Sequence, residues 1–97
     1  MTNLISTDVL KRRIENSEEL IILDVRTNEE WDEFHLPGAI HIPLHELESR
    51  LSEIECHKDC EIIVYCRSGG RSGQACMFLE LSGFCKPVNL KGGISAW

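Results

Sequence analysis

An apolar run, a cysteine and a glycine-rich turn follow one another in Glu61-Ile62-Ile63-Val64-Tyr65-Cys66-Arg67-Ser68-Gly69-Gly70-Arg71-Ser72. Residues 61–65 are mainly apolar and β-branched, which predicts a buried strand. The adjacent glycines let the backbone turn with its N–H groups inward, because glycine accepts positive φ. A helix is expected over residues 73–81, starting near Ser72, with its positive end facing the thiol. The pattern is therefore strand, loop and helix.

Strand-like and helical segments alternate on both sides of this stretch. Residues 20–25 are apolar on both faces, which predicts a second buried strand. Further short strands are expected at 39–42 and 87–90, the latter beginning at a proline. The alternation predicts an α/β fold over residues 1–97, with a mainly parallel central sheet flanked by helices on both faces.

Helix signals fall between these strands. Ser6 or Thr7 can cap a first helix, and three apolar side chains are expected on it: Val9, Leu10 and Ile14. Thr27 and Glu30 form a capping box, which predicts a short helix over residues 29–34. Four side chains at three- and four-residue spacing predict the inward stripe of another helix: Leu44, Leu47, Leu51 and Ile54.

Composition narrows the class of protein. The 97 residues suit one domain, and the net charge of −6 disfavours binding to nucleic acid or to an anionic membrane. No apolar run is long enough to span a membrane. The first six residues lack the basic and apolar regions of a secretory signal, so we expect a cytoplasmic protein whose five cysteines are free thiols.

Cys66 is the candidate reactive group. It follows a strand, and ligands of open parallel sheets bind at the carboxyl ends of strands. Loop N–H groups, a helix start and the flanking Arg67 and Arg71 all favour a thiolate over a thiol. The sequence therefore predicts a site that holds negative charge on this sulfur.

Three segments of the chain carry a recognisable pattern. The first comprises Leu23-Asp24-Val25-Arg26, Glu30-Trp31 and His35-Leu36-Pro37-Gly38-Ala39-Ile40-His41-Ile42-Pro43. The second is Tyr65-Cys66-Arg67-Ser68-Gly69-Gly70-Arg71-Ser72. The third comprises Gly83-Phe84, Val88, Leu90, Gly92-Gly93 and Ala96-Trp97. Together they resemble the single-domain rhodanese family of sulfurtransferases, in the same order and over nearly the whole chain.

The resemblance implies a catalytic cysteine at Cys66 and a six-residue active loop, made of Cys66, Arg67, Ser68, Gly69, Gly70 and Arg71. It implies that the thiolate takes a sulfane sulfur from thiosulfate or another small anionic donor and forms a persulfide. Cyanide or a thiol then accepts the sulfur, and a sulfur-relay protein is a further expected partner. No metal or organic cofactor is needed.

Supporting roles are expected for the residues around the loop. Arg71 is the better candidate for orienting an anionic donor or bracing the loop, whereas Arg67 is expected to point outward. Either arginine could instead pair with an acid such as Asp24. The resemblance implies scaffold roles for Asp24, Arg26 and His35.

The chain departs from the family pattern at three places, one of which is His45, where the family commonly has an acidic or polar helix cap. Phe34 stands where the family usually has glycine before the histidine. The family usually continues past the final tryptophan, whereas this sequence stops at Trp97, so we expect a shortened last helix.

Other classes of protein also use cysteines of this kind. Cysteine phosphatases and arsenate reductases have five residues between cysteine and arginine, but only four separate Cys66 from Arg71. A persulfide carrier or redox-sensing module needs the same thiol and stays open. Zinc sites usually need a second ligand pair, and none is evident for Cys56 and Cys60, so a redox role for them is the better alternative. Cys76 is expected in the core, and Cys85 has no predicted role.

Overall fold

The computed structural model describes residues 3–97, which form a five-stranded sheet with every neighbouring pair of strands parallel. The strands are β1 (Asn3–Ile5), β2 (Ile22–Asp24), β3 (Ile40–His41), β4 (Glu61–Tyr65) and β5 (Lys86–Leu90). Their order across the sheet is β1-β5-β4-β2-β3, so β4 is central. The predicted α/β fold with a parallel sheet is confirmed.

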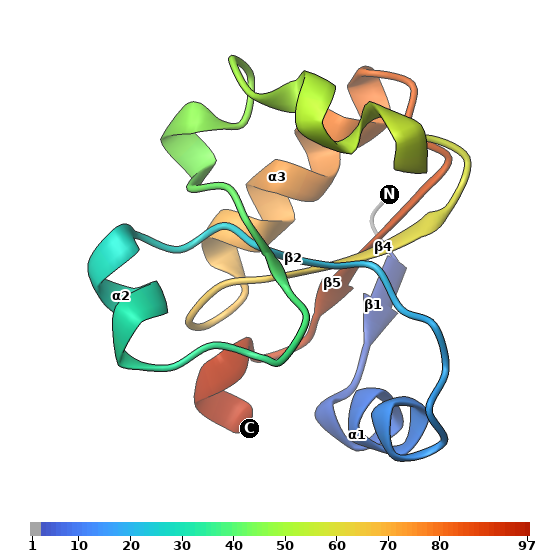
Figure 1. Cartoon of the computed structure of the whole chain (residues 1–97), viewed down its shortest axis with the longest axis vertical. Helices are drawn as coiled ribbons and strands as arrows, with labels where there is room; N and C mark the ends of the chain where they lie inside the picture. The colour runs from blue at the N-terminus through green and yellow to red at the C-terminus, as the bar shows by residue number, and fades with distance from the viewer. Residues whose placement is uncertain (1–2) are drawn as a thin grey trace.

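Helices cover both faces of this sheet, as predicted (Figure 1). The α-helices are α1 (Thr7–Glu15), α2 (Asn28–Glu33) and α3 (Gly70–Leu81), and the 3₁₀ segments are η1 (Leu44–Glu46), η2 (Leu51–His57) and η3 (Ile94–Ala96). Side chains of α3, η1 and η2 form one apolar cluster against the sheet, and those of α1 and η3 form another. None of the helices within residues 3–97 is long and apolar enough to cross a membrane.

Both predicted caps are present. The Ser6 hydroxyl accepts the Val9 N–H at 3.2 Å at the start of α1. At the start of α2 the Thr27 hydroxyl accepts the Glu30 N–H, and the Glu30 carboxylate accepts the Thr27 N–H at 3.1 Å. Each cap satisfies backbone donors that the first turn of a helix leaves unpaired.

One predicted helix differs from the structure. The single helix expected around Leu47 and Ile54 is two 3₁₀ segments, because Arg50 has φ −111° and ψ 14° and interrupts the helical path. The four side chains predicted to face inward nevertheless do so. Leu47 and Ile54 are fully buried, and Leu44 and Leu51 are partly buried against the same cluster.

On α1 only Leu10 is buried, whereas Val9 and Ile14 are exposed. A nine-residue helix presents one narrow stripe to the sheet.

The observed strands also differ from the predicted ones in length and number. The strand predicted over residues 20–25 is the shorter β2, and β1 was not predicted at all. β1 has three residues and lies at the sheet edge, where it pairs only with β5 among the described strands. Such a short segment carries too little pattern to identify a strand.

Candidate active site

Cys66 lies at the carboxyl end of β4, where the sequence placed it. The loop after it runs straight into α3, which begins at Gly70 rather than at the predicted residue 73. Gly69 precedes the helix with φ 107°, a conformation open mainly to glycine, and this tight reversal lets the helix start early. Figure 1 shows the loop and α2 at the same end of the sheet.

Hydrogen-bond donors surround the Cys66 sulfur. The Gly69 N–H points at Sγ from 3.1 Å, and the Ser72 hydroxyl lies 3.3 Å from it. Burial alone would raise the pKa of the thiol, but the Ser72 hydroxyl and the N–H groups of Ser72, Gly69 and Ser68 outweigh it. The pKa of Cys66 is therefore lowered from its ordinary value, which favours the thiolate.

Ser72 is itself held by a residue that the sequence did not suggest. Its hydroxyl lies 2.5 Å from Oδ1 of Asn89 on β5, and the Asn89 amide donates to the Gly69 carbonyl at 3.1 Å. A hydroxyl has one hydrogen, so Ser72 donates either to Asn89 or to Cys66 at a given moment. Asn89 could have been found from its position within an apolar strand, because a buried asparagine needs hydrogen-bond partners.

Arg71 binds Glu30 and braces the loop against α2. Its two terminal nitrogens donate to the two carboxylate oxygens at 2.7 and 3.0 Å. These bonds with Arg71 lower the pKa of Glu30 to about 2, and the same pairing raises the pKa of Arg71. The predicted bracing role fits this geometry, whereas the sequence identified Glu30 only as a capping residue.

Asp24 and Arg26 form a buried ion pair beside the loop. The Arg26 guanidinium donates to Asp24 at 2.7 Å and to the Phe34 carbonyl at 2.6 Å. Burial and the nearby Asp24 carboxylate raise the pKa of Tyr65, so its phenol stays protonated, and its oxygen accepts the Leu36 N–H at 3.1 Å. The alternative that Arg67 or Arg71 pairs with an acid is met at Arg71, but its partner is Glu30 rather than Asp24, because Arg26 binds Asp24.

His35 fixes the segment after α2. Its Nδ1 lies 2.9 Å from the Trp31 carbonyl, and its ring stacks on the Trp31 indole at 3.5 Å between centroids. His41 stacks near the same indole, at 4.6 Å, and its Nε2 lies 2.8 Å from the Arg26 carbonyl. Both histidines thus contact structural neighbours rather than Cys66, in keeping with the scaffold role predicted for His35.

The last turn, η3, is hydrogen-bonded to the start of the loop. The Ile94 N–H donates to the Cys66 carbonyl at 2.9 Å, and the Ser95 N–H donates to the Arg67 carbonyl at 3.0 Å. η3 itself is a three-residue 3₁₀ turn. The Arg67 side chain is exposed, as predicted for a residue that points outward.

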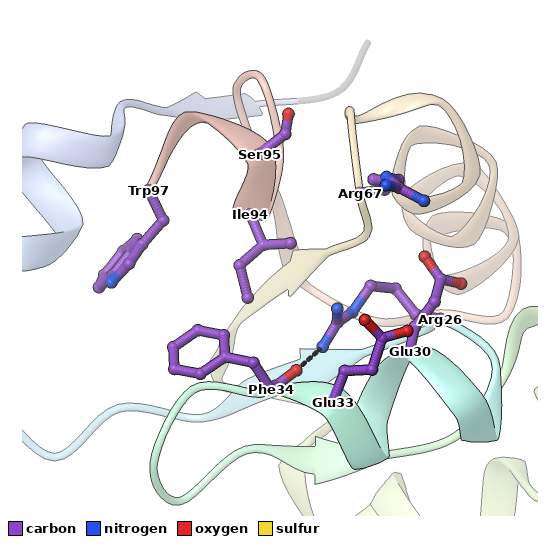
Figure 2. A pocket seen from close by; sticks show the side chains of 8 residues that line it. All are labelled: Arg26, Glu30, Glu33, Phe34, Arg67, Ile94, Ser95 and Trp97. Carbon is purple, nitrogen blue, oxygen red and sulfur yellow. Dashed lines mark hydrogen bonds between the residues drawn. The ribbon is translucent and has the colours of Figure 1, made fainter.

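A hollow of about 390 Å³ lies beside the loop (Figure 2). Its lining comes from the ends of β2 and α2, the loop and η3: Arg26, Glu30, Glu33, Phe34, Arg67, Ile94, Ser95 and Trp97. A smaller hollow of about 270 Å³ shares Arg26 with the first and includes Arg71. Cys66 lines neither hollow and is only 1% exposed, so its sulfur sits beneath the loop.

The remaining cysteines lie away from this centre. Cys76 is buried in the core, as predicted, and burial raises the pKa of its thiol to about 12. Cys56, Cys60 and Cys85 are exposed and free. Within residues 3–97 no three side chains of the metal-binding types are grouped so that they could hold an ion.

Comparisons with known proteins identify the family. The family described as "Rhodanese-like domain" matches residues 6–97. A protein named "Sulfurtransferase" from Allochromatium vinosum is 40% identical over 97 residues, which is 100% of this chain and 89% of that protein. "Putative sulfur carrier protein YrkF" from Bacillus subtilis is 40% identical over 96% of this chain, which spans 49% of that protein.

A solved structure supports the same family assignment. A rhodanese-like domain protein from Staphylococcus aureus superposes with a TM-score of 0.89 at 33% identity, covering 100% of this chain and 91% of that one. The similarity therefore extends over sheet, helices and active loop together. The chain belongs to the rhodanese-like domain family.

Proposed function

We propose that this protein is a sulfurtransferase that moves a sulfane sulfur from thiosulfate or a persulfide donor to cyanide or a thiol, through a persulfide on Cys66. The observation that carries the proposal is the ring of donors around Sγ, with Gly69 N–H at 3.1 Å and Ser72 Oγ at 3.3 Å. Donors aimed at a sulfur stabilise its anion, and the thiolate is the nucleophilic form.

In the first half-reaction the Cys66 thiolate attacks the outer sulfur of thiosulfate. A bond forms between the two sulfurs as the donor's own S–S bond breaks, and sulfite leaves with the electron pair. In the second half-reaction an acceptor attacks the terminal sulfur of the persulfide, and Cys66 recovers its electron pair. The residues supply orientation and charge stabilisation, and these steps draw on no metal or organic cofactor.

The burial of Cys66 supports the transfer of a single small atom. With 1% of its surface exposed, the residue offers little room for a bulky reacting centre. The Arg71 guanidinium is held by both Glu30 oxygens, which counts against a cradle for phosphate or arsenate. Arg71 is already bound by Glu30, and only four residues separate Cys66 from Arg71. Both observations favour sulfur transfer over phosphatase or arsenate reductase activity.

A non-turnover persulfide carrier is the second candidate. The relative named as a putative sulfur carrier favours it, and the same comparison supports a sulfur-relay protein as partner. Carrier and enzyme share the loaded Cys66 but differ in repeated turnover of a small donor. We place either activity in the cytoplasm, whose reducing conditions suit the free exposed cysteines.

The test is intact-protein mass spectrometry after exposure to thiosulfate. We expect the mass to rise by one sulfur atom, mapped to the peptide that contains Cys66, and we expect Cys66→Ser to stay unmodified. Cys85→Ser, which removes an exposed thiol elsewhere, should load like the natural protein. Loading and turnover that persist in Cys66→Ser would refute the mechanism. Loading of Cys66 without catalytic turnover would favour the carrier.

A further inference from the structure

The hollow beside the active loop has two chemically different ends. Figure 2 shows Arg67 on the loop side of the hollow, the Arg26 guanidinium near its middle with a hydrogen bond to the Phe34 carbonyl, and the side chains of Phe34, Ile94 and Trp97 on the opposite side. Its volume of about 390 Å³ falls in the range of sites that bind small organic molecules. This shape and chemistry fit a ligand with one charged atom and one apolar body.

Only one of the two arginines has a free guanidinium. Arg26 is bound to Asp24 and to the Phe34 carbonyl. The Arg67 guanidinium has no hydrogen bond or ion pair within residues 3–97. Glu33 also faces the hollow as an unpaired acid within the same range, and it disfavours a second anionic group on the ligand. Among the described residues, Arg67 is therefore the group of this lining that is free to pair with an anion.

Backbone hydrogen bonds fix the hollow relative to the reactive residue. The Ile94 N–H donates to the Cys66 carbonyl at 2.9 Å, and the neighbouring Ser95 N–H donates to the Arg67 carbonyl at 3.0 Å. The apolar wall and the loop thus form one connected unit. A ligand whose body lies in the hollow therefore lies next to Arg67, the residue that follows Cys66.

Building on the proposed sulfur transfer, we propose that this hollow binds an organic thiol acceptor, with its thiolate at Arg67 and an aryl or alkyl body against Phe34 and Trp97. Thiosulfate and cyanide carry no such body, so they do not need this surface. The acceptor sulfur bonds to the terminal sulfur of the Cys66 persulfide as the S–S bond within that persulfide breaks. The electron pair of the broken bond stays on Cys66, and the acceptor leaves as an organic persulfide.

Phe34 is the residue that sets this preference. Its side chain is 53% exposed although it is a large apolar group, and a ligand that covers it removes that surface from water. Its backbone is extended, with φ −170° and ψ 142°, so no glycine is required at this position. An aromatic side chain here extends the apolar wall formed by Ile94 and Trp97.

The test measures the acceptor half-reaction alone. Protein loaded by thiosulfate is freed of donor and mixed with benzyl mercaptan, which has an apolar body, or with 2-mercaptoethanol, which does not. We expect Phe34→Ala to lower the second-order rate about tenfold for benzyl mercaptan and to leave 2-mercaptoethanol unchanged. Phe34→Leu, which keeps an apolar side chain, should restore most of the rate. Leu81→Ala removes another exposed apolar group, on α3, and should alter neither rate.

Sulfur uptake by Cys66 distinguishes a failure of the proposed function from a failure of the proposed acceptor site. If the natural protein takes no sulfur onto Cys66, the proposed function fails before any acceptor is added. If loading is normal but Phe34→Ala treats both thiols like the natural protein, the hollow is not the acceptor site. An equal loss for both thiols also overturns the inference, because it indicates a general disturbance rather than recognition of an apolar body.

Discussion

Ser72 connects the charge on Cys66 to the interior of the protein. Its hydroxyl reaches both Cys66 Sγ and Asn89 Oδ1, and Ser72 is fully buried. When the sulfur is anionic, the hydrogen bond that the hydroxyl donates to it is charge-assisted. Such a bond is stronger than one between neutral groups. The thiolate is therefore stabilised by a side chain as well as by the backbone of the loop.

Replacing Ser72 by alanine removes this donor and should raise the pKa of Cys66. Fewer thiolates at neutral pH should slow sulfur loading about tenfold, the effect of losing one hydrogen bond to a charged group. Loading from thiosulfate followed by mass spectrometry at pH 7 measures the change. Ser82→Ala, at the residue that follows α3, should load normally, because within residues 3–97 its hydroxyl bonds only the Phe78 carbonyl. An unchanged loading rate in Ser72→Ala would remove Ser72 from the stabilisation of the thiolate.

The ion pair between Glu30 and Arg71 joins α2 to the start of α3. Glu30→Gln keeps the capping-box geometry but removes the charge, and we expect it to cost about 1 kcal/mol, because the pair is partly exposed. The pKa of Glu30 is lowered to about 2, so its contribution is complete above the ordinary glutamate value of about 4.3 and is lost as pH falls toward 2.

Urea unfolding between pH 6 and pH 2 would measure both effects of Glu30→Gln. The variant should lose less stability than the natural protein as the pH falls through this window. Glu48→Gln, which changes an acid without an ion pair within residues 3–97, is the control. Equal acid sensitivity in the natural protein and Glu30→Gln would show that the ion pair does not contribute to stability.

η3 supports the active loop through Gly93. This glycine has φ 62°, and an added Cβ would lie 2.6 Å from the Ser68 nitrogen and would also meet the Arg67 carbonyl. Gly93→Ala should therefore displace the loop and reduce both stability and sulfur loading. Gly38→Ala is the matched control, because Gly38 also has positive φ but has open space around it. Gly38→Ala should lose about 1 kcal/mol of stability while loading normally. If both variants load equally well, η3 does not shape the loop.

Across the molecule, local patterns predicted most of the sheet and the position of Cys66. The strand before Cys66 and the capping box at Thr27 each depend on residues close in sequence. The pairing of Glu30 with Arg71 was not predicted, because 41 residues separate the two and no local pattern links them. Asn89 was likewise missed, since its partners lie on the loop and on α3. Contacts between distant segments are set by the packing of the whole sheet.

The fold brings three independent segments to one sulfur. β4 delivers Cys66, α3 and its preceding loop supply the donors, and β5 supplies Asn89, which holds those donors in place. Because the strands are parallel, their carboxyl ends meet at one edge of the sheet, beside the start of α3. The anion-stabilising environment is therefore a consequence of the topology and does not depend on the loop alone.

The pH dependence of sulfur loading on Cys66 tests this environment most directly. The initial rate of persulfide formation from thiosulfate, followed by mass spectrometry, reports the fraction of thiolate at each pH. We predict a half-maximal rate at a pH below the ordinary thiol value of about 8.5, with a plateau above it. A midpoint at or above that value would show that the loop does not stabilise the anion, and would contradict the mechanism.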